Sequence, residues 1–209
     1  MTINTLKTVI LSEISEKGYT QIKFPASKDF ETLVGSLGEI IQRTEIRVSP
    51  NKSGRLVASN RAMAFHTDHN EAKFVAWFCR NQSSMGGHTL LLDSRELLNF
   101  FSEKSKQALS EITVKTHNVF YGDKLSIPLL NLSSNNPTIY YAPWLVNNPG
   151  FSHHRSVLAK LENQLSLFDP IKILLSEGDL LIVDNHRMLH GREAFPEKSG
   201  RWLTRFWIR

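Results

Sequence analysis

Cysteine and long apolar runs are nearly absent from this sequence. Its single cysteine, Cys79, excludes an internal disulfide, and we expect a buried thiol in a reducing, cytoplasmic protein. Apolar runs such as FVAWFC at residues 74–79 are far too short to cross a membrane as a helix. The N-terminal segment carries acidic residues within its apolar pattern and lacks a small-residue cleavage site, so we expect no signal peptide.

Clustered basic residues are also lacking. The chain has 25 Lys and Arg against 20 Asp and Glu, a net charge of +5, yet no three basic residues are consecutive. There is no zinc-finger spacing and no basic helix, which argues against a nucleic-acid partner. The net positive charge instead favours small anionic ligands. With no repeat, linker or low-complexity tract, the 209 residues are expected to form one domain, residues 1–209.

The spacing of apolar residues predicts many short strands with helices at the N-terminus and as insertions. Helices are expected over residues 4–17 (ending at Gly18), 28–42 (with Ser27 as N-cap), 94–110 and 154–168. Strands are expected at residues 19–24, 61–68, 73–81, 86–94, 112–120, 125–130, 137–144, 171–175, 178–190 and 201–209. This pattern favours a β-barrel or β-sandwich core decorated with helices.

Ligand-type residues gather at the end of one predicted strand, in the stretch AFHTDHNE. Alternation along a strand places Ala62, Ala64, His66 and Asp68 on one face, with small residues beside an imidazole and a carboxylate. Two such groups can occupy adjacent positions around a metal. A second histidine from a facing strand would complete the 2-His-1-carboxylate set that leaves open positions on Fe(II).

The stretch RMLHGREAFPEKSGRWLTR supplies that histidine and two cations. His190 is followed eleven residues later by Arg201 and fifteen later by Arg205, which share one face of an apolar strand. A 2-oxo acid that chelates iron needs a fixed cation for its distal carboxylate, and a buried arginine remains charged. The hydroxyl of Thr89, in the strand GGHTLL, is a further candidate partner.

These motifs together resemble the TauD/TfdA (taurine dioxygenase-like) family of Fe(II)- and 2-oxoglutarate-dependent dioxygenases. The segments FHTDHNEAK and GGHTLLLDS are similar to the metal strand and the GG-x-T-L segment of that family. The C-terminal segment GDLLIVDNHRMLHGREAF…RWLTR is similar to its signature, with features of the clavaminate synthase and asparagine oxygenase branch.

The resemblance implies a mainly β fold, a double-stranded β-helix (jelly roll) with flanking helices. It makes His66, Asp68 and His190 the iron ligands, and it assigns the distal carboxylate of 2-oxoglutarate to Arg201 with help from Thr89. Arg205 is placed nearer the iron, on the cosubstrate or on an acidic substrate group. The implied reaction consumes O₂ and 2-oxoglutarate, releases succinate and CO₂, and hydroxylates an unactivated C–H bond of a small metabolite.

The substrate is expected to be an amino acid or an amino-acid derivative. Asp68 argues against halogenation, since related halogenases carry a small residue there. The chain is short for the family, so we expect either a large or carrier-bound substrate, or a second copy of the chain that closes the pocket. Desaturation or another oxidative rearrangement stays open, as do a nucleic-acid substrate, a zinc hydrolase and a non-catalytic binding module.

Other polar residues near these motifs have weaker expectations. His69 and Asn70 are candidates for the substrate side, although an exposed loop role is equally compatible. His117 is expected in an exposed loop, and Arg192 is expected to pair with a carboxylate. Asn185 is expected to fix the turn before His190.

Overall fold

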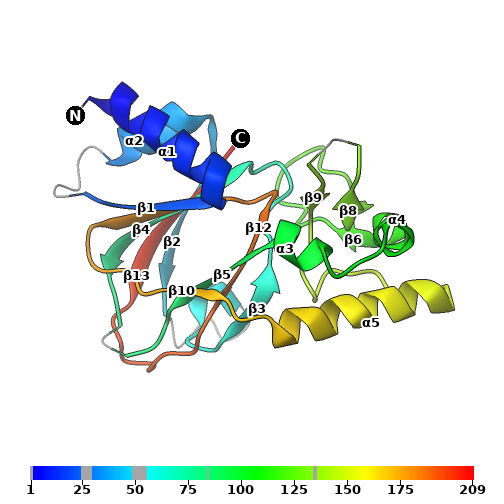
Figure 1. Ribbon diagram of the computed structural model, residues 1–209. Coiled ribbons are helices and arrows are strands. Elements are labelled where there is room, and N and C mark those ends of the chain that lie inside the picture. The colour runs from blue at the N-terminus through cyan, green and yellow to red at the C-terminus, as the bar shows by residue number, and fades with distance from the viewer. Residues whose placement is uncertain (1, 25–29, 49–55, 84, 134–135) are drawn as a thin grey trace.

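The computed structural model describes residues 2–24, 30–48, 56–83, 85–133 and 136–209. Its core is a pair of antiparallel sheets (Figure 1). The five-stranded sheet has the order β1 (Tyr19–Lys23), β11 (Asp179–Asp184), β4 (Phe74–Asn81), β13 (Trp202–Ile208) and β2 (Ile40–Arg47). The four-stranded sheet has the order β10 (Ile171–Ile173), β5 (Thr89–Asp93), β12 (Met188–Arg192) and β3 (Met63–His66). The predicted jelly roll with flanking helices is confirmed.

The larger sheet is buried on both faces, and strand β4 shows why. Its residues Phe74, Ala76 and Phe78 pack in the cluster that contains the N-terminal helices, whereas the residues between them pack in the cluster that contains the smaller sheet. Because strand side chains alternate, one apolar strand contributes to two cores. Cys79 belongs to the cluster between the sheets and is fully buried, as expected.

Helices α1 (Ile3–Lys17) and α2 (Phe30–Leu37) cover the outer face of the larger sheet (Figure 1). Helix α1 ends at Gly18, whose φ of 84° is left-handed and whose N–H donates to the Ile14 carbonyl. This is the predicted helix end, because glycine takes that conformation without steric cost. The predicted cap of α2, Ser27, lies outside the described residues.

The predicted second helix is too long. Helix α2 stops at Leu37, and residues 40–47 form β2, which pairs with the last strand of the chain. The chain passes close to the C-terminus at Gly38, where a Cβ would collide with the Arg209 carbonyl. Pairing with a segment far away in the sequence decides this strand, so local helix propensity did not reveal it.

A second group of elements packs against the smaller sheet at the other end of the molecule (Figure 1). The predicted helix 94–110 is two helices, α3 (Ser94–Leu98) and α4 (Glu103–Glu111), because Ser102 caps a new helix by accepting from the Ser105 N–H. The remaining elements of this group are β6 (Thr113–Lys115), β7 (Ser126–Pro128), β8 (Leu130–Asn131), β9 (Thr138–Ile139) and α5 (Ser152–Leu167).

Among the described residues, no helix combines the length and the apolar character needed to span a membrane.

Removing the Phe30 side chain tests the packing of α2 on the larger sheet. Phe30 is 1% exposed and stacks on Phe78 with ring centroids 4.0 Å apart. We expect Phe30→Ala to lower the free energy of unfolding by about 3–5 kcal/mol in urea denaturation, because it leaves a cavity between helix and sheet. The matched control is Phe100→Ala, at a ring that is 54% exposed, where a change within about 0.5 kcal/mol is expected. Equal losses for the two variants would contradict this packing.

Candidate active site

Three ligand-type side chains meet where β3 pairs with β12. His66, the last residue of β3, lies directly opposite His190, and their ring centroids are 4.3 Å apart. Asp68 follows two residues after His66, with carboxylate oxygens 4.0 Å from Nε2 of His66 and 3.9 Å from Nε2 of His190. All three side chains are buried, and their ligand atoms lie within 4.8 Å of one another. The structure therefore brings together the three residues that the sequence singled out.

Asp68 is held by an amide that comes from the other sheet. Asn185, at the end of β11, accepts from the Asp68 N–H at 2.7 Å and donates to the carbonyls of His69 and Ala72 at 3.1 and 2.9 Å. Asn185 is 1% exposed, so these three bonds satisfy a buried amide. The sequence predicted that Asn185 fixes its own turn, whereas it fixes the turn that carries Asp68.

A β-bulge changes which residues share a face with His66. The pairing of β3 with β12 shifts register between His66 and Met63, so β3 has one extra residue there. Met63 consequently lines the interior with His66, whereas Ala62 and Ala64 are exposed. The expectation that the two alanines make room inside the barrel is wrong, because strict alternation does not survive a bulge. The Ala64 carbonyl instead accepts from Nδ1 of His66 at 2.9 Å.

The protonation states at this site follow from burial and one neighbouring cation. Burial lowers the pKa of His66, and it lowers the pKa of His190 to about 3, so both imidazoles are neutral. Burial alone would raise the pKa of Asp68. Arg205, helped by the hydrogen bond from Trp207, outweighs that effect and holds the pKa of the carboxyl well below its usual range. Two neutral imidazoles and one carboxylate form a donor set for a divalent cation.

Arg205 and Trp207 orient the carboxylate of Asp68. Nη1 of Arg205 donates to both carboxylate oxygens at 3.0 Å, and Nε1 of Trp207 donates to Oδ2 at 2.8 Å. Both residues come from β13, where Arg205 also lines the interior, as the sequence predicted. Its contact with Asp68 was not foreseen from the sequence, and such outer-shell contacts fix the geometry of a metal ligand.

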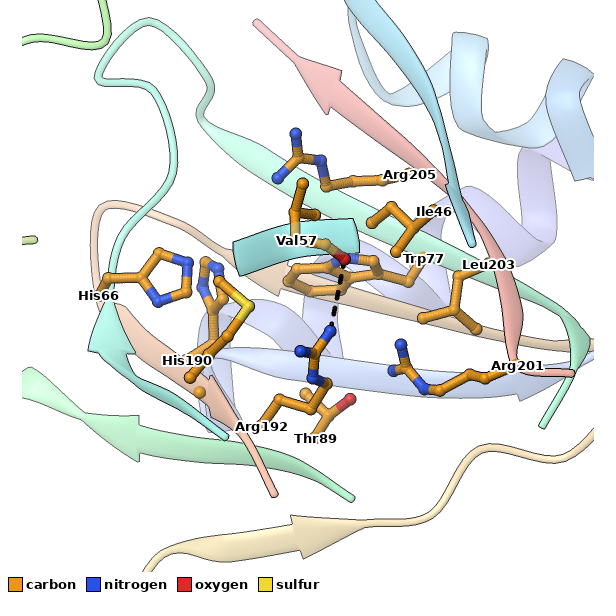
Figure 2. A pocket seen from close by; sticks show the side chains of 12 residues that line it. Ile46, Val57, His66, Trp77, Thr89, His190, Arg192, Arg201, Leu203 and Arg205 are labelled. Atoms are coloured by element: carbon orange, nitrogen blue, oxygen red, sulfur yellow. Dashed lines mark hydrogen bonds between the residues drawn. The ribbon is translucent and has the colours of Figure 1, made fainter. Parts of the chain in front are cut away.

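One cavity beside these residues contains three arginines, and we call it the arginine cavity (Figure 2). Its free space is about 50 Å³, room for a few water molecules, because long side chains extend into it. It is lined by Ile46, Val57, Met63, His66, Trp77, Thr89, His190, Gly191, Arg192, Arg201, Leu203 and Arg205.

Arg201 is buried in this cavity beside Thr89. Its Nε donates to Oε1 of Gln82 at 3.0 Å, and no carboxylate pairs with it among the described residues. Burial lowers its pKa to about 10, so the guanidinium still carries its charge at neutral pH. Gly87 lies nearby with a left-handed φ of +74°, a conformation that glycine takes without steric cost. The site thus presents a buried cation and a hydroxyl to the cavity.

Arg192 is the residue of this cavity that the sequence misassigned. It was expected to pair with a carboxylate, but its guanidinium donates to the carbonyls of Ser59 and Arg61, both at 2.7 Å, and of Val57 at 3.5 Å. Arg192 lies two residues after His190 on β12. Strand alternation therefore gave a signal that it shares the interior face.

A second cavity, of about 310 Å³, lies on the Asp68 side, and we call it the aromatic cavity. Trp144, which is 44% exposed, forms part of its wall, so the cavity reaches solvent. The ring of Trp144 lies 5.0 Å from that of His66. The full lining is Val57, Met63, His66, Asp68, His117, Trp144, Arg205 and Trp207.

His117 lines the aromatic cavity, although the sequence predicted an exposed loop. Its Nδ1 lies 3.0 Å from the hydroxyl of Tyr140, and that hydroxyl donates to the Lys115 carbonyl. The hydroxyl has one proton, so it accepts from Nδ1–H, and Nε2 is left as a hydrogen-bond acceptor. Burial lowers the pKa of His117 to about 4, which keeps the ring neutral.

The two candidate substrate residues His69 and Asn70 do not line either cavity. His69 is fully buried, and its Nε2 bonds to Oδ2 of Asp123 at 3.0 Å. The same Asp123 oxygen accepts from two backbone N–H groups of the loop that carries His117. Asn70 donates to Glu71 and lines a separate surface pocket. His69 therefore supports the wall of the aromatic cavity from behind, because its ring faces the loop.

Comparisons with known sequences find one matching family and two relatives. The family described as taurine catabolism dioxygenase TauD, TfdA family matches residues 170–207. The chain is 28% identical over 203 residues to 3-((Z)-2-isocyanoethenyl)-1H-indole synthase from Fischerella ambigua, covering 85% of this chain and 73% of that protein. It is 27% identical over 176 residues to mitochondrial trimethyllysine dioxygenase from Gallus gallus, covering 69% of this chain and 41% of that protein.

Solved structures with the same fold are similar over nearly the whole chain. Asparagine oxygenase in complex with Fe(II), 2S,3S-3-hydroxyasparagine and succinate has a TM-score of 0.80 at 17% identity, covering 98% of this chain and 79% of that one. The non-heme iron oxygenase OrfP in complex with Fe and alpha-ketoglutaric acid has a TM-score of 0.76 at 18% identity, covering 98% and 79%. At this level of identity the structural match establishes the fold.

Replacing Asn185 tests how the turn that carries Asp68 is held. We expect Asn185→Ala to lower the free energy of unfolding by about 2–4 kcal/mol in urea denaturation, because one N–H and two carbonyls lose buried partners. Asn163→Ala, at an exposed position of α5, is the matched control and should change stability little. A loss below about 0.5 kcal/mol for Asn185→Ala would show that this amide does not hold the turn.

Proposed function

Because the TauD, TfdA family model matches residues 170–207 and the fold is that of solved non-haem iron oxygenases, we propose that the chain is an Fe(II)- and 2-oxoglutarate-dependent oxygenase that hydroxylates an amino acid or an amino-acid derivative. One observation carries the proposal. The buried cluster of His66, Asp68 and His190 lies between an arginine-rich cavity, suited to a dicarboxylate, and an aromatic cavity that reaches solvent.

The cluster fits Fe(II) by its chemistry. Nδ1 of His66 is engaged with a backbone carbonyl, which leaves Nε2 of that ring as the ligand atom. Nε2 of His190 faces Asp68, 3.9 Å from its carboxylate, whereas Nδ1 is buried with no hydrogen-bond partner among the described residues. Together with Asp68, these residues form the facial triad typical of non-haem iron oxygenases.

The arginine cavity fits 2-oxoglutarate by its charge. Arg201 is a buried cation without a carboxylate partner among the described residues, an arrangement that an anionic ligand would stabilise. Its planar guanidinium matches a carboxylate, and the Thr89 hydroxyl adds a donor. We assign the distal carboxylate of 2-oxoglutarate to these two residues. Entry of the ligand requires some side chains of the lining to move, since the free space is small.

In the proposed reaction the protein supplies ligand geometry, orientation and a dry site. Bound iron, with 2-oxoglutarate and O₂, supplies the oxidation that converts a substrate C–H bond to C–OH and releases succinate and CO₂. Arg205 and Trp207 hold the Asp68 carboxylate in one orientation. With a substrate bound, the rings of Trp144 and Trp207 would help it to exclude water from that side of the site.

The aromatic cavity supports a small, polar substrate with an apolar part. His117 presents an acceptor to an N–H or O–H group, and Arg205 presents a cation to an anionic group. Asparagine oxygenase and OrfP are described with hydroxylated amino acids, and trimethyllysine dioxygenase is named for an amino acid. Since Trp144 leaves the cavity open to solvent, a carrier-bound substrate or a cover from a second copy of the chain remains compatible.

Desaturation is the second candidate outcome, and one finding favours it. The name of the relative from Fischerella ambigua describes a product with an ethenyl group, hence a carbon–carbon double bond. The mass of the product distinguishes the two outcomes. Hydroxylation adds one oxygen atom, whereas desaturation removes two hydrogen atoms.

The role of Arg201 is tested by anaerobic titration with Fe(II) and 2-oxoglutarate. We expect a weak visible charge-transfer band that needs both components. In Arg201→Ala the 2-oxoglutarate concentration for half-saturation should rise by about a hundredfold or more, because a buried charge partner is lost, while Fe(II) binding persists. Arg95→Ala, at an exposed arginine, should behave as the wild type. Absence of the band in the wild type would overturn the proposed function, and an unchanged midpoint in Arg201→Ala would overturn this assignment.

The role of His117 is tested by succinate formation with a panel of amino acids and carrier-bound aminoacyl groups. For an accepted substrate, His117→Phe should raise the substrate KM by about tenfold, because one hydrogen bond is lost, and should leave the 2-oxoglutarate KM unchanged. His153→Phe, at an exposed position, is the matched control. If His117→Phe raises both KM values equally, His117 supports the whole site and does not contact the substrate.

A further inference from the structure

Arg192 connects the arginine cavity to a separate piece of chain. Its guanidinium is held by carbonyls at positions 57, 59 and 61, within and just after the short 3₁₀ helix η1 (Leu56–Ala58). Figure 2 shows the side chain pointing toward Val57 between His190 and Arg201. Val57 itself lines both the arginine cavity and the aromatic cavity. One side chain therefore holds a segment, residues 57–61, that borders both cavities.

Arg192 also lies beside the residues assigned to the distal carboxylate. On β12 it is the direct cross-strand partner of Thr89 on β5. The guanidinium carbons of Arg192 and Arg201 lie 5.0 and 5.2 Å from the centre of one ring, that of Phe195. Arg192 at the end of β12, Thr89 at the start of β5 and Arg201 just before β13 therefore all border the same volume.

Two guanidinium groups in one buried volume repel each other. Both side chains are buried, at 6% and 5% exposure. An anion between the two cations would relieve this repulsion and would favour the position that Arg192 takes in the cavity.

We propose that Arg192 is a positioning residue that couples 2-oxoglutarate binding to the packing of residues 57–61. The inference rests on the proposed function. The bound dicarboxylate keeps the Arg192 guanidinium in the cavity, and the guanidinium keeps the segment at the border of the two cavities through its carbonyls. Because such coupling is reciprocal, the packed segment also strengthens the binding of 2-oxoglutarate.

Binding and proteolysis together test this coupling. The Kd of 2-oxoglutarate is measured anaerobically from the charge-transfer band at saturating Fe(II). The rate of tryptic cleavage of the Arg61–Ala62 bond is followed by mass spectrometry with and without 2-oxoglutarate. In the wild type we expect 2-oxoglutarate to slow this cleavage by at least about fivefold, as coupling of this kind typically changes affinities by 5–150-fold.

Two variants of Arg192 separate its charge from its hydrogen bonds. Arg192→Ala should raise the Kd of 2-oxoglutarate by about tenfold or more and abolish the protection of the Arg61–Ala62 bond even at saturation, with Fe(II) binding unchanged. Arg192→Lys keeps the charge without the planar set of donors. Arg192→Lys should therefore recover part of the affinity for 2-oxoglutarate but not the protection of the Arg61–Ala62 bond. A purely structural role of Arg192 would not separate these two effects. Arg95→Ala, at an exposed arginine, serves as the control for both measurements.

The outcomes also separate this inference from the proposed function. A wild type without a charge-transfer band contradicts the proposed function itself. With the band present, a wild-type cleavage rate that 2-oxoglutarate leaves unchanged overturns the coupling. A Kd of 2-oxoglutarate for Arg192→Ala within twofold of the wild-type value also overturns the coupling. If Arg192→Ala does not fold, Arg192→Lys tests the coupling instead. Full protection of the Arg61–Ala62 bond in that variant would contradict the proposed role of the carbonyl contacts.

Discussion

The ionised carboxylate of Asp68 is the interaction on which the site depends. It is one buried negative charge, and Arg205, Trp207 and the two histidines all face it. A buried carboxylate persists only where charge and hydrogen bonds replace its lost water. Arg205 supplies the charge, so the imidazoles are free to remain neutral, and neutral imidazoles are the form that binds a metal ion. Strand β13 therefore contributes to the metal site through the orientation of its ligand.

The same strand divides the interior into two compartments. Arg201 immediately precedes β13 and Arg205 lies within it, and of these two arginines only Arg205 lines both cavities. A cosubstrate with two carboxylates and a substrate with its own polar groups must approach one metal from different directions. Two separate cavities that share His66 and Arg205 satisfy that requirement, because each ligand can occupy its own cavity. The short segment at Val57 borders both compartments, so whatever fixes that segment influences the two ligands together.

Motif reasoning selected neighbouring residues where side-chain chemistry and regular strand geometry were enough to do so. His66, Asp68, His190, Thr89, Arg201 and Arg205 were chosen because their side chains suit a metal ion and a dicarboxylate, and the structure gathers all six in one region. Motif reasoning failed where the backbone is irregular or where a residue contacts a segment that is distant in the sequence. The bulge in β3 moved Ala62 and Ala64 to the outside. Strand β2 forms only because the final strand pairs with it, and His117 reaches the interior on a loop that Asp123 and His69 hold in place.

The sequence by itself determined which residues are candidate metal ligands, which cations face inward near the last strand, and the mainly β fold, because side-chain chemistry and a period of two are local properties. Only the tertiary structure decided that Arg205 donates to Asp68, that Asn185 holds the turn that carries Asp68, and that Arg192 bonds to residues 57–61 at the cavity. Each of these is a hydrogen bond between segments more than a hundred residues apart. Such bonds form wherever folding leaves a buried polar group in reach of a partner, and no local pattern in the sequence records which partner that is.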